Sequence, residues 1–115
     1  MSDVTILHNP RCSKSRQTLA LLEEQGIAPK VRLYLEDALS VDELKALQGQ
    51  LGFDDVRKMM RTKEDAYKDL GLADASEAQL LVAIADNPKL LERPAVIKNG
   101  QARLGRPPEQ VLEIL

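Results

Sequence analysis

Residues 4–35 have the sequence VTILHNPRCSKSRQTLALLEEQGIAPKVRLYL, and this stretch decides the fold. Its first four residues are apolar at nearly every position, which is typical of a short strand buried on both faces. Asn9-Pro10 ends that strand, and a helical pattern follows from about residue 13 to residue 25, before Gly26. In the next segment Val31, Leu33 and Leu35 alternate with Arg32 and Tyr34, which predicts a second strand. Strand, helix and strand in this order predict a βαβ unit with parallel strands and a right-handed crossover.

The middle of the chain is predicted to be helical. Ser40-Val41-Asp42-Glu43 and Ser76-Glu77-Ala78-Gln79 both have the pattern of a capping box, so each should begin a helix. Between them we expect two shorter helices, one from Asp54 or Asp55 to Met60 and one over residues 63–70.

The last third of the chain is predicted to form two more strands and a final helix. Residues 94–98 and 101–104 are predicted to pair as a hairpin, because Asn99-Gly100 between them is the preferred pair for a type I′ turn. A final helix should start at Pro107-Pro108, with its inward side chains being Val111, Leu112 and Leu115.

The order β-α-β, helical segment, β-β-α predicts an α/β protein with a thioredoxin-like fold. We expect a mixed four-stranded sheet with helices on both faces. We interpret residues 1–115 as a single domain that contains an all-helical insertion at about residues 37–91, since no repeat or linker interrupts the pattern.

Composition excludes several classes of protein. One Cys and one His among 115 residues exclude an internal disulfide and a structural zinc site, and we expect no bound metal or cofactor. Three aromatic residues offer no stacking platform for nucleic acid. The longest apolar run, Leu80 to Ala85, is too short to span a membrane, and Met1-Ser2-Asp3 does not resemble the start of a signal peptide. We therefore expect a cytoplasmic protein, and we expect it to be a monomer.

The formal net charge of −2 is unevenly distributed. Residues 1–20 have a net charge of +2 and residues 88–107 of +4, whereas residues 36–80 carry eleven acids and six bases. Most of these charges belong to solvated faces. The two basic segments indicate a functional site only if the fold brings them together in space.

Cys12 is the candidate nucleophile. It is expected between the first strand and the first helix, where the helix dipole, the unpaired backbone N–H groups and the cations Arg11, Lys14 and Arg16 all favour a thiolate. The alternative is an inert buried cysteine, which is the usual state of a lone Cys. Ser15 stands where a second cysteine of a Cys-x-x-Cys motif would be, so a resolving thiol has to come from outside the chain.

Four further residues are candidates for the site. His8, four residues before Cys12, can stabilise the thiolate as an imidazolium or simply cap the loop. Arg61, Arg93 and Arg106 each stand at an element boundary, and a guanidinium suits tetrahedral oxyanions. In a thioredoxin-like sheet the turn before the third strand lies beside the first helix, which places Arg93 close to Cys12. Each arginine taken alone is better explained as a surface residue, and only their agreement with a pattern favours a site.

Together these segments resemble a known family. The sequences His8-Asn9-Pro10-Arg11-Cys12, Leu33-Tyr34-Leu35-Glu36, Arg61, Arg93-Pro94 and Arg106-Pro107 are similar, in order and spacing, to those of the glutaredoxin-dependent (ArsC-like) arsenate reductase family. The resemblance covers essentially the whole chain and is strongest to a bacterial arsenate reductase-like branch. After the cysteine this chain has Ser13-Lys14-Ser15, where the best-established members have Gly-Thr-Ser, and Lys14 alters the anion loop.

The resemblance implies a mechanism. Cys12 would attack arsenate, His8 would help to keep Cys12 ionised, and Pro94 would be a cis-proline beside the site. The substrate-binding residues would be Arg61, Arg93, Arg106 and Ser15. Glutathione as co-substrate would then attack the adduct and release arsenite, and glutaredoxin would resolve the mixed disulfide.

Two other functions remain open from the sequence. One is a monothiol redox protein that acts on glutathionylated proteins, for which Arg93 should matter little. The other is a non-enzymatic regulatory binding protein, since a neighbouring branch of the superfamily regulates RNA polymerase. Those relatives usually carry Cys-x-x-Cys, which this chain lacks.

Overall fold

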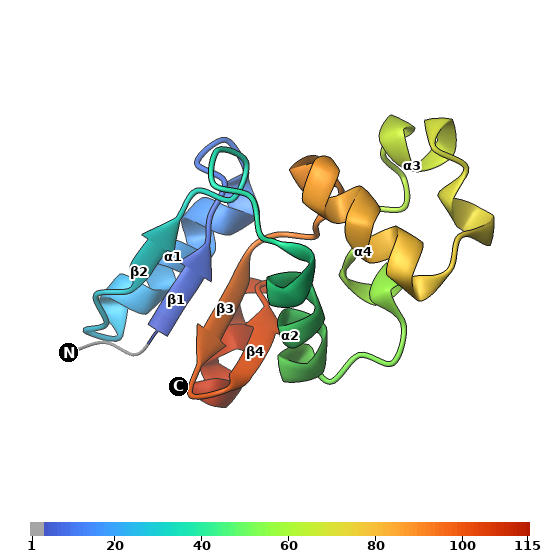
Figure 1. The fold of residues 1–115 in the computed structure, drawn as a ribbon. Coiled ribbons are helices and arrows are strands. Elements are labelled where there is room, and N and C mark those ends of the chain that lie inside the picture. The colour runs from blue at the N-terminus through green and yellow to red at the C-terminus, as the bar shows by residue number, and fades with distance from the viewer. Residues whose placement is uncertain (1–3) are drawn as a thin grey trace. The chain divides into compact units, whose positions relative to one another are not determined.

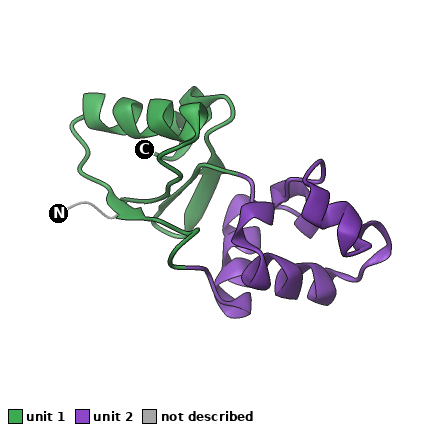
Figure 2. Cartoon of the chain, turned by 90° about the horizontal axis from the view of Figure 1, so that it is seen from above, with its two compact units in different colours: residues 1–37, 93–115 green, residues 38–92 purple. Residues whose placement is uncertain are grey.

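The computed structural model describes residues 4–115, so the prediction made for Met1-Ser2-Asp3 lies outside the described residues. The chain divides into two compact units (Figure 2). The first combines the N-terminal part, through Asp37, with Arg93–Leu115, and the second is residues 38–92. Each is described separately below, and the assignment of all 115 residues to a single domain stays a prediction.

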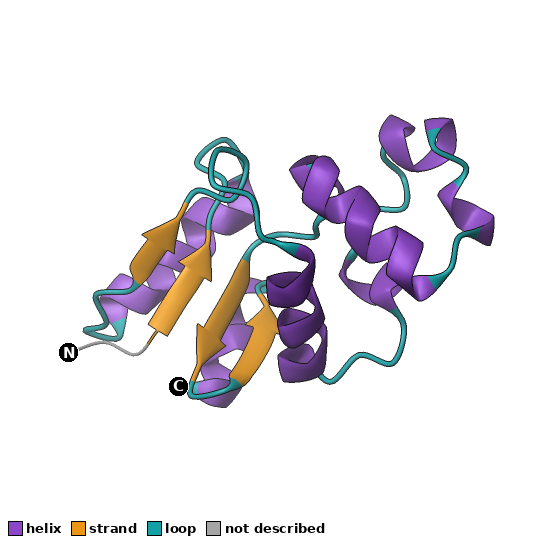
Figure 3. Ribbon diagram, viewed as in Figure 1, coloured by secondary structure: helices purple, strands orange, loops and turns teal. Residues whose placement is uncertain are grey.

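The first unit contains the predicted mixed sheet (Figures 1 and 3). Its strand order is β2-β1-β3-β4, with β1 and β2 parallel and the other two pairs antiparallel. The thioredoxin-like α/β fold and the βαβ unit are therefore confirmed. The elements, in chain order, are β1 (Val4–Leu7), α1 (Ser13–Glu24), β2 (Lys30–Arg32), β3 (Ala95–Lys98), β4 (Gln101–Leu104) and a 3₁₀ helix (Pro108–Ile114).

One apolar core holds this unit together. Side chains of the two central strands pack against α1 and the C-terminal 3₁₀ helix, which both lie on the same face of the sheet (Figure 1). The buried members are Val4, Ile6, Leu22, Val96, Val111 and Ile114. The expectation of helices on both faces is thus not met by the helices of this unit, which share one face.

The strand β2 is shorter than the alternation predicted. The backbone leaves the sheet after Arg32 and turns, because the N–H groups of Glu36 and Asp37 both donate to the carbonyl oxygen of Leu33. The alternating apolar residues are exposed, to 43% for Val31, 37% for Leu33 and 44% for Leu35, whereas Tyr34 between the two leucines is 1% exposed. The prediction of a second strand is confirmed over Lys30–Arg32, but the strand does not continue to Leu35.

The C-terminal helix has a different period from the predicted one. It is a 3₁₀ helix, in which side chains three residues apart lie above one another, and its buried residues are Pro108, Val111 and Ile114. Leu112, which an α-helical period would turn inward, is 40% exposed. The prediction of Val111 was confirmed, whereas that of Leu112 was wrong.

The hairpin between β3 and β4 agrees with the sequence. Asn99 and Gly100 have φ angles of 51° and 79°, which are the positive values that a type I′ turn requires at both central residues. The turn sets the register of the two strands, in which Lys98 pairs with Gln101. In this register Ala95 pairs with Leu104, so Pro94, which precedes β3, lies beside Gly105, which follows β4.

The second unit is helical, as predicted. The hydroxyls of Ser40 and Ser76 each accept a hydrogen bond from the N3 amide, and the N3 side chain accepts one from the serine backbone N–H, so both capping boxes are confirmed. No helix within residues 4–115 is long and apolar enough to cross a membrane. The elements are α2 (Val41–Leu51), α3 (Asp65–Asp69), α4 (Glu77–Asp86) and 3₁₀ helices at Val56–Met59, Leu72–Asp74 and Pro88–Leu90.

Candidate active site

Cys12 lies at the junction of β1 and α1, where the sequence predicted it. It is the N-cap residue of α1, and a tight turn precedes it, in which the Cys12 amide donates to the Asn9 carbonyl oxygen at 3.0 Å. The Asn9 side chain stabilises the same turn by accepting from the Arg11 amide at 3.0 Å. Cys12 is only 9% exposed, yet Arg11 and Lys14 beside it are exposed, so the thiol sits just beneath a basic rim.

Several groups act on the ionisation of Cys12. Burial raises the pKa of the thiol, but the Ser15 amide, the Arg93 guanidinium and the Lys14 amide together outweigh burial and hold the pKa below that of a free cysteine. The two amides belong to the first turn of α1, where N–H groups lack a helical partner. A thiolate is the nucleophilic form of cysteine, so this arrangement favours reactivity.

Ser15 and His8 form a buried pair beneath the loop. Ser15 is fully buried, its Oγ lies 2.7 Å from His8 Nδ1, and the Asn9 amide donates to the same Oγ at 3.0 Å. The Ser15 hydroxyl is therefore occupied by the loop itself. The part of Ser15 that acts on the thiol is its backbone N–H, so any contribution to anion binding is expected from the amide.

The electrostatics of His8 favour a neutral ring. Burial lowers the pKa of His8, and the positive charge of Arg16 lowers it further. A neutral imidazole can accept a hydrogen bond from the Ser15 hydroxyl at Nδ1, which fits the short distance between Ser15 Oγ and His8 Nδ1. This contact fixes the loop geometry rather than supplying a positive charge, and the role of His8 in catalysis stays a prediction.

Arg93 reaches the thiol from the far end of the chain. Its guanidinium is placed to hydrogen-bond to the Cys12 sulfur and to stabilise its negative charge, which confirms the predicted proximity. The Arg93–Pro94 peptide bond is cis, as the resemblance implied. A cation beside a thiolate can bind an incoming oxyanion, and that role remains a prediction.

Two residues that the sequence did not single out shape this corner. Gly105 donates to the Pro94 carbonyl oxygen at 2.9 Å, and a Cβ on Gly105 would lie 2.4 Å from Thr18 Oγ1 and 2.7 Å from Pro94 Cγ. Thr18 is fully buried in α1 and donates to the Lys14 carbonyl oxygen at 2.8 Å. The signal in the sequence is the glycine of Gly105-Arg106-Pro107, since a residue without a side chain suits a closely packed position.

The other two predicted arginines have different surroundings. Arg106 is exposed, and its Nη1 lies 3.5 Å from the Arg93 carbonyl oxygen, so the structure brings it to the same corner as Arg93. Arg61 belongs to the second unit, where its amide donates to the Leu90 carbonyl oxygen at 2.7 Å and its guanidinium pairs with Glu64. The substrate-binding roles of both stay predictions.

A cleft opens on the other side of the loop. Its volume is about 240 Å³, and it is bounded by His8–Arg11 on one side and by Leu33, Leu35 and Glu36 on the other. Leu33 and Leu35 therefore line a recess next to the candidate nucleophile. The first unit thus offers a thiolate-favouring cysteine, an adjacent guanidinium and an open recess.

Comparisons with known proteins point in one direction. A family model described as the ArsC family matches residues 7–114. "Uncharacterized protein YfgD" of Escherichia coli (strain K12) is 58% identical over 114 residues, with 97% of this chain and 96% of that protein covered. "Arsenate reductase" of Haemophilus influenzae is 56% identical over 114 residues, with 97% and 98% covered. The solved structure "Arsenate reductase from Vibrio cholerae" has a TM-score of 0.96 at 64% identity, with 97% of each chain covered.

Proposed function

Because this chain belongs to the ArsC family, we propose that it is an oxidoreductase that reduces arsenate to arsenite through a covalent adduct on Cys12. The observation that supports this most directly is the position of Cys12, whose thiolate is favoured by two helix N–H groups and by Arg93. A thiolate next to a guanidinium is suited to bind and attack an oxyanion. Relatives named arsenate reductase, at 50–56% identity, support the same substrate.

The first step is nucleophilic substitution at arsenic. The Cys12 thiolate attacks arsenate, an As–O bond breaks, the departing oxygen leaves as water after protonation, and an S–As(V) bond forms. Arg93 stabilises the oxyanion, and we assign supporting roles to Arg106 and Arg61. The basic rim of Arg11 and Lys14 attracts the anion towards the thiol.

The second step needs a thiol that the chain does not contain, since Cys12 is its single cysteine. We propose that the glutathione thiolate attacks the Cys12 sulfur of the adduct, so that the S–As bond breaks and its electron pair stays on arsenic. Arsenic is reduced from As(V) to As(III), the two thiols are oxidised to a mixed disulfide, and arsenite leaves. Glutaredoxin then reduces that disulfide, and the cytosol, where thiols are kept reduced, suits this chemistry.

The test is arsenite formation from arsenate in the presence of glutathione and glutaredoxin. The Cys12→Ser variant should have no activity, and Arg93→Ala should lower kcat/KM by about 10²-fold or more because one charge-assisted contact to the anion is lost. Arg103→Ala is the matched control: it removes one guanidinium from the same unit, where Arg103 pairs with Glu113 at 2.9 Å, and it should retain activity. Absence of arsenite formation by the wild-type protein with active reductants would refute the proposal.

The choice of reductant is tested separately. Replacing glutathione and glutaredoxin by thioredoxin and its reductase should abolish turnover, whereas equal turnover would show that the reductant is assigned wrongly while the arsenate chemistry stands. A monothiol redox protein would give a different pattern. It would release glutathione from a glutathionylated peptide, require Cys12, and be insensitive to Arg93→Ala.

A further inference from the structure

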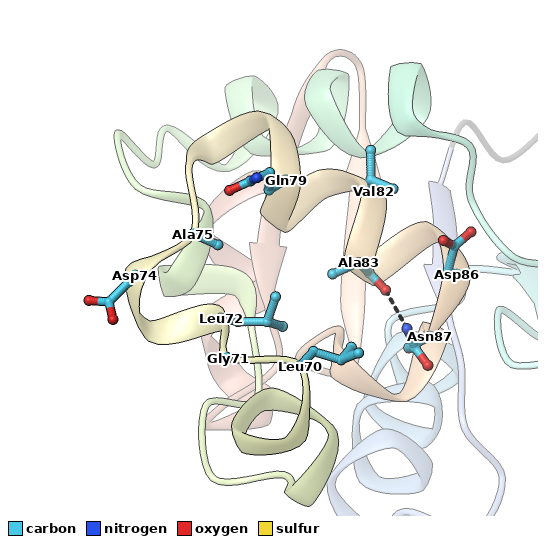
Figure 4. Close-up of a pocket in the computed structure, with 10 residues that line it drawn as sticks. All are labelled: Leu70, Gly71, Leu72, Asp74, Ala75, Gln79, Val82, Ala83, Asp86 and Asn87. Atoms are coloured by element: carbon cyan, nitrogen blue, oxygen red, sulfur yellow. Dashed lines mark hydrogen bonds between the residues drawn. The ribbon is translucent and has the colours of Figure 1, made fainter.

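A second recess lies entirely within residues 38–92 and contains none of the residues of the candidate active site. It is a groove of about 410 Å³ between α4 and the segment that joins α3 to the following 3₁₀ helix (Figure 4). The arsenate reductase chemistry proposed above makes no use of it.

Apolar side chains line the middle of the groove. Leu72 and Ala83, which are 5% and 8% exposed, line its inner part. Leu70 and Val82 stand on opposite walls and are 52% and 49% exposed (Figure 4). Both are among the most exposed large apolar side chains of the described residues, and exposed apolar side chains around a concavity mark sites of interaction.

The charges of the groove have one sign. Among the described residues that line it, the ionisable ones are Asp74 and Asp86, and no cation faces the recess. The two carboxylates lie at opposite ends of the groove, with the apolar side chains between them (Figure 4). Charge complementarity therefore favours an occupant with a cation near each end and an apolar middle.

The walls of the groove determine the form of the occupant. Gln79, Val82, Ala83 and Asp86 follow one face of α4 with the spacing i, i+3, i+4, i+7. The lining belongs to helices and their connections, so it offers no strand edge to which an extended peptide could add. A helix laid into an apolar groove is the recognition mode that such a surface fits. The face from Gln79 to Asp86 is about 10 Å long at the rise of an α-helix.

We propose that this groove is a docking site for a cationic amphipathic helix of another protein. The helix would place apolar side chains spaced i, i+3 or i+4, and i+7 against Leu70, Leu72 and Val82. Lysine or arginine side chains about two turns apart would pair with Asp74 and Asp86. The binding is independent of Cys12, so it would hold whatever the outcome of the arsenate assay.

The experiment measures binding of a synthetic probe by fluorescence anisotropy. The probe is a fluorescein-labelled helical peptide with leucines at i, i+3, i+4 and i+7 and a lysine near each end, and its control is a scrambled peptide of the same composition. The probe should bind the full chain at one saturable site, at least about tenfold more tightly than the scrambled peptide does. Amide chemical-shift changes should be confined to residues 70–87.

Matched variants distinguish specific binding in the groove from non-specific electrostatic attraction to an acidic surface. Val82→Gln and the double variant Asp74→Asn/Asp86→Asn should each weaken binding by at least about fivefold. The controls remove equivalent groups from the first unit: Leu112→Gln replaces an exposed leucine, and Glu23→Gln/Glu24→Gln removes two exposed carboxylates. Both controls should change the Kd by less than about twofold, and thermal melts should show all variants folded.

Three results would overturn the proposal. Equal binding of the scrambled peptide, or equal loss of affinity in the glutamate control, would show diffuse electrostatic attraction. Concentration-dependent dimerisation that protects residues 70–87 from the probe would show that a second copy of the chain is the occupant.

Discussion

The substitution Gly105→Ala tests how closely the active-site corner is packed. The added Cβ would lie 2.4 Å from Thr18 Oγ1, 2.7 Å from Pro94 Cγ and 3.1 Å from Thr18 Cγ2. An ordinary van der Waals contact begins near 3.4 Å, so Thr18 Oγ1 has to retreat by about 1.0 Å and Pro94 Cγ by about 0.7 Å. Gly105 is not in the left-handed region, so the effect is one of space and not of backbone conformation.

The expected destabilisation follows from two terms. Overpacking a filled site costs about 1–3 kcal/mol. Rotating Thr18 away from the new methyl group would also break its hydrogen bond to the Lys14 carbonyl oxygen, which contributes about 1 kcal/mol. We therefore expect the free energy of unfolding to fall by about 2–4 kcal/mol, which corresponds to a decrease in Tm of roughly 4 °C for each kcal/mol.

Urea unfolding followed by far-UV circular dichroism measures this difference, and Gly49→Ala is the matched control. Gly49 lies within α2, an added Cβ there meets nothing within 4 Å, and its φ is ordinary, so alanine should stabilise by about 0.5–1 kcal/mol. Adding Thr18→Ala to Gly105→Ala should recover part of the loss through a coupling of about 1 kcal/mol. An unchanged urea midpoint for Gly105→Ala, with the expected gain for Gly49→Ala, would refute the steric reasoning.

Four other predictions concern the thiol and the second unit. Arg93→Gln should shift the pH midpoint of iodoacetamide alkylation of Cys12 upwards, towards that of a free cysteine; an unshifted midpoint would exclude Arg93 as a stabilising charge. Since the pKa of the thiol is lower in the folded state, the free energy of unfolding should rise with pH between the folded and unfolded pKa values, and Cys12→Ser should remove that rise. Arg57→Lys should lower the urea midpoint and the hydrogen-exchange protection of residues 72–75. The Arg57 guanidinium donates through Nε to the Tyr67 hydroxyl at 3.1 Å, while its Nη2 lies 2.8–3.0 Å from three carbonyl oxygens of residues 72–75, and the single nitrogen of lysine cannot make both sets of contacts; unchanged protection there would contradict this. Ser76→Ala should destabilise by about 1 kcal/mol by removing the cap of α4, with the exposed Ser13→Ala as a control that removes no cap, and an equal effect of both would count against the capping assignment.

Much of the fold was predictable because its signals are local. The capping boxes at Ser40 and Ser76, the Asn99-Gly100 turn and Gly26 after α1 each act through backbone geometry within a few residues. The position of Cys12 at the start of α1 followed from the same local reasoning. Where prediction failed, as in the length of β2 and at Leu112, the outcome depended on where the backbone leaves the sheet and on the exact period of a helix, and neither is encoded by the alternation of residues alone.

The sequence by itself determined the chemistry that is possible: one thiol at a strand-to-helix junction, basic residues around it and no second cysteine, so that a reductant must be external. Only the tertiary structure decided which groups act on that thiol. Arg93 reaches Cys12 from 81 positions away in the chain because β3 pairs antiparallel with β1, and Gly105 fits between Pro94 and Thr18 because β4 returns along β3. The reason is physical: capping and turns depend on neighbours in sequence, whereas a pKa and a close contact depend on neighbours in space.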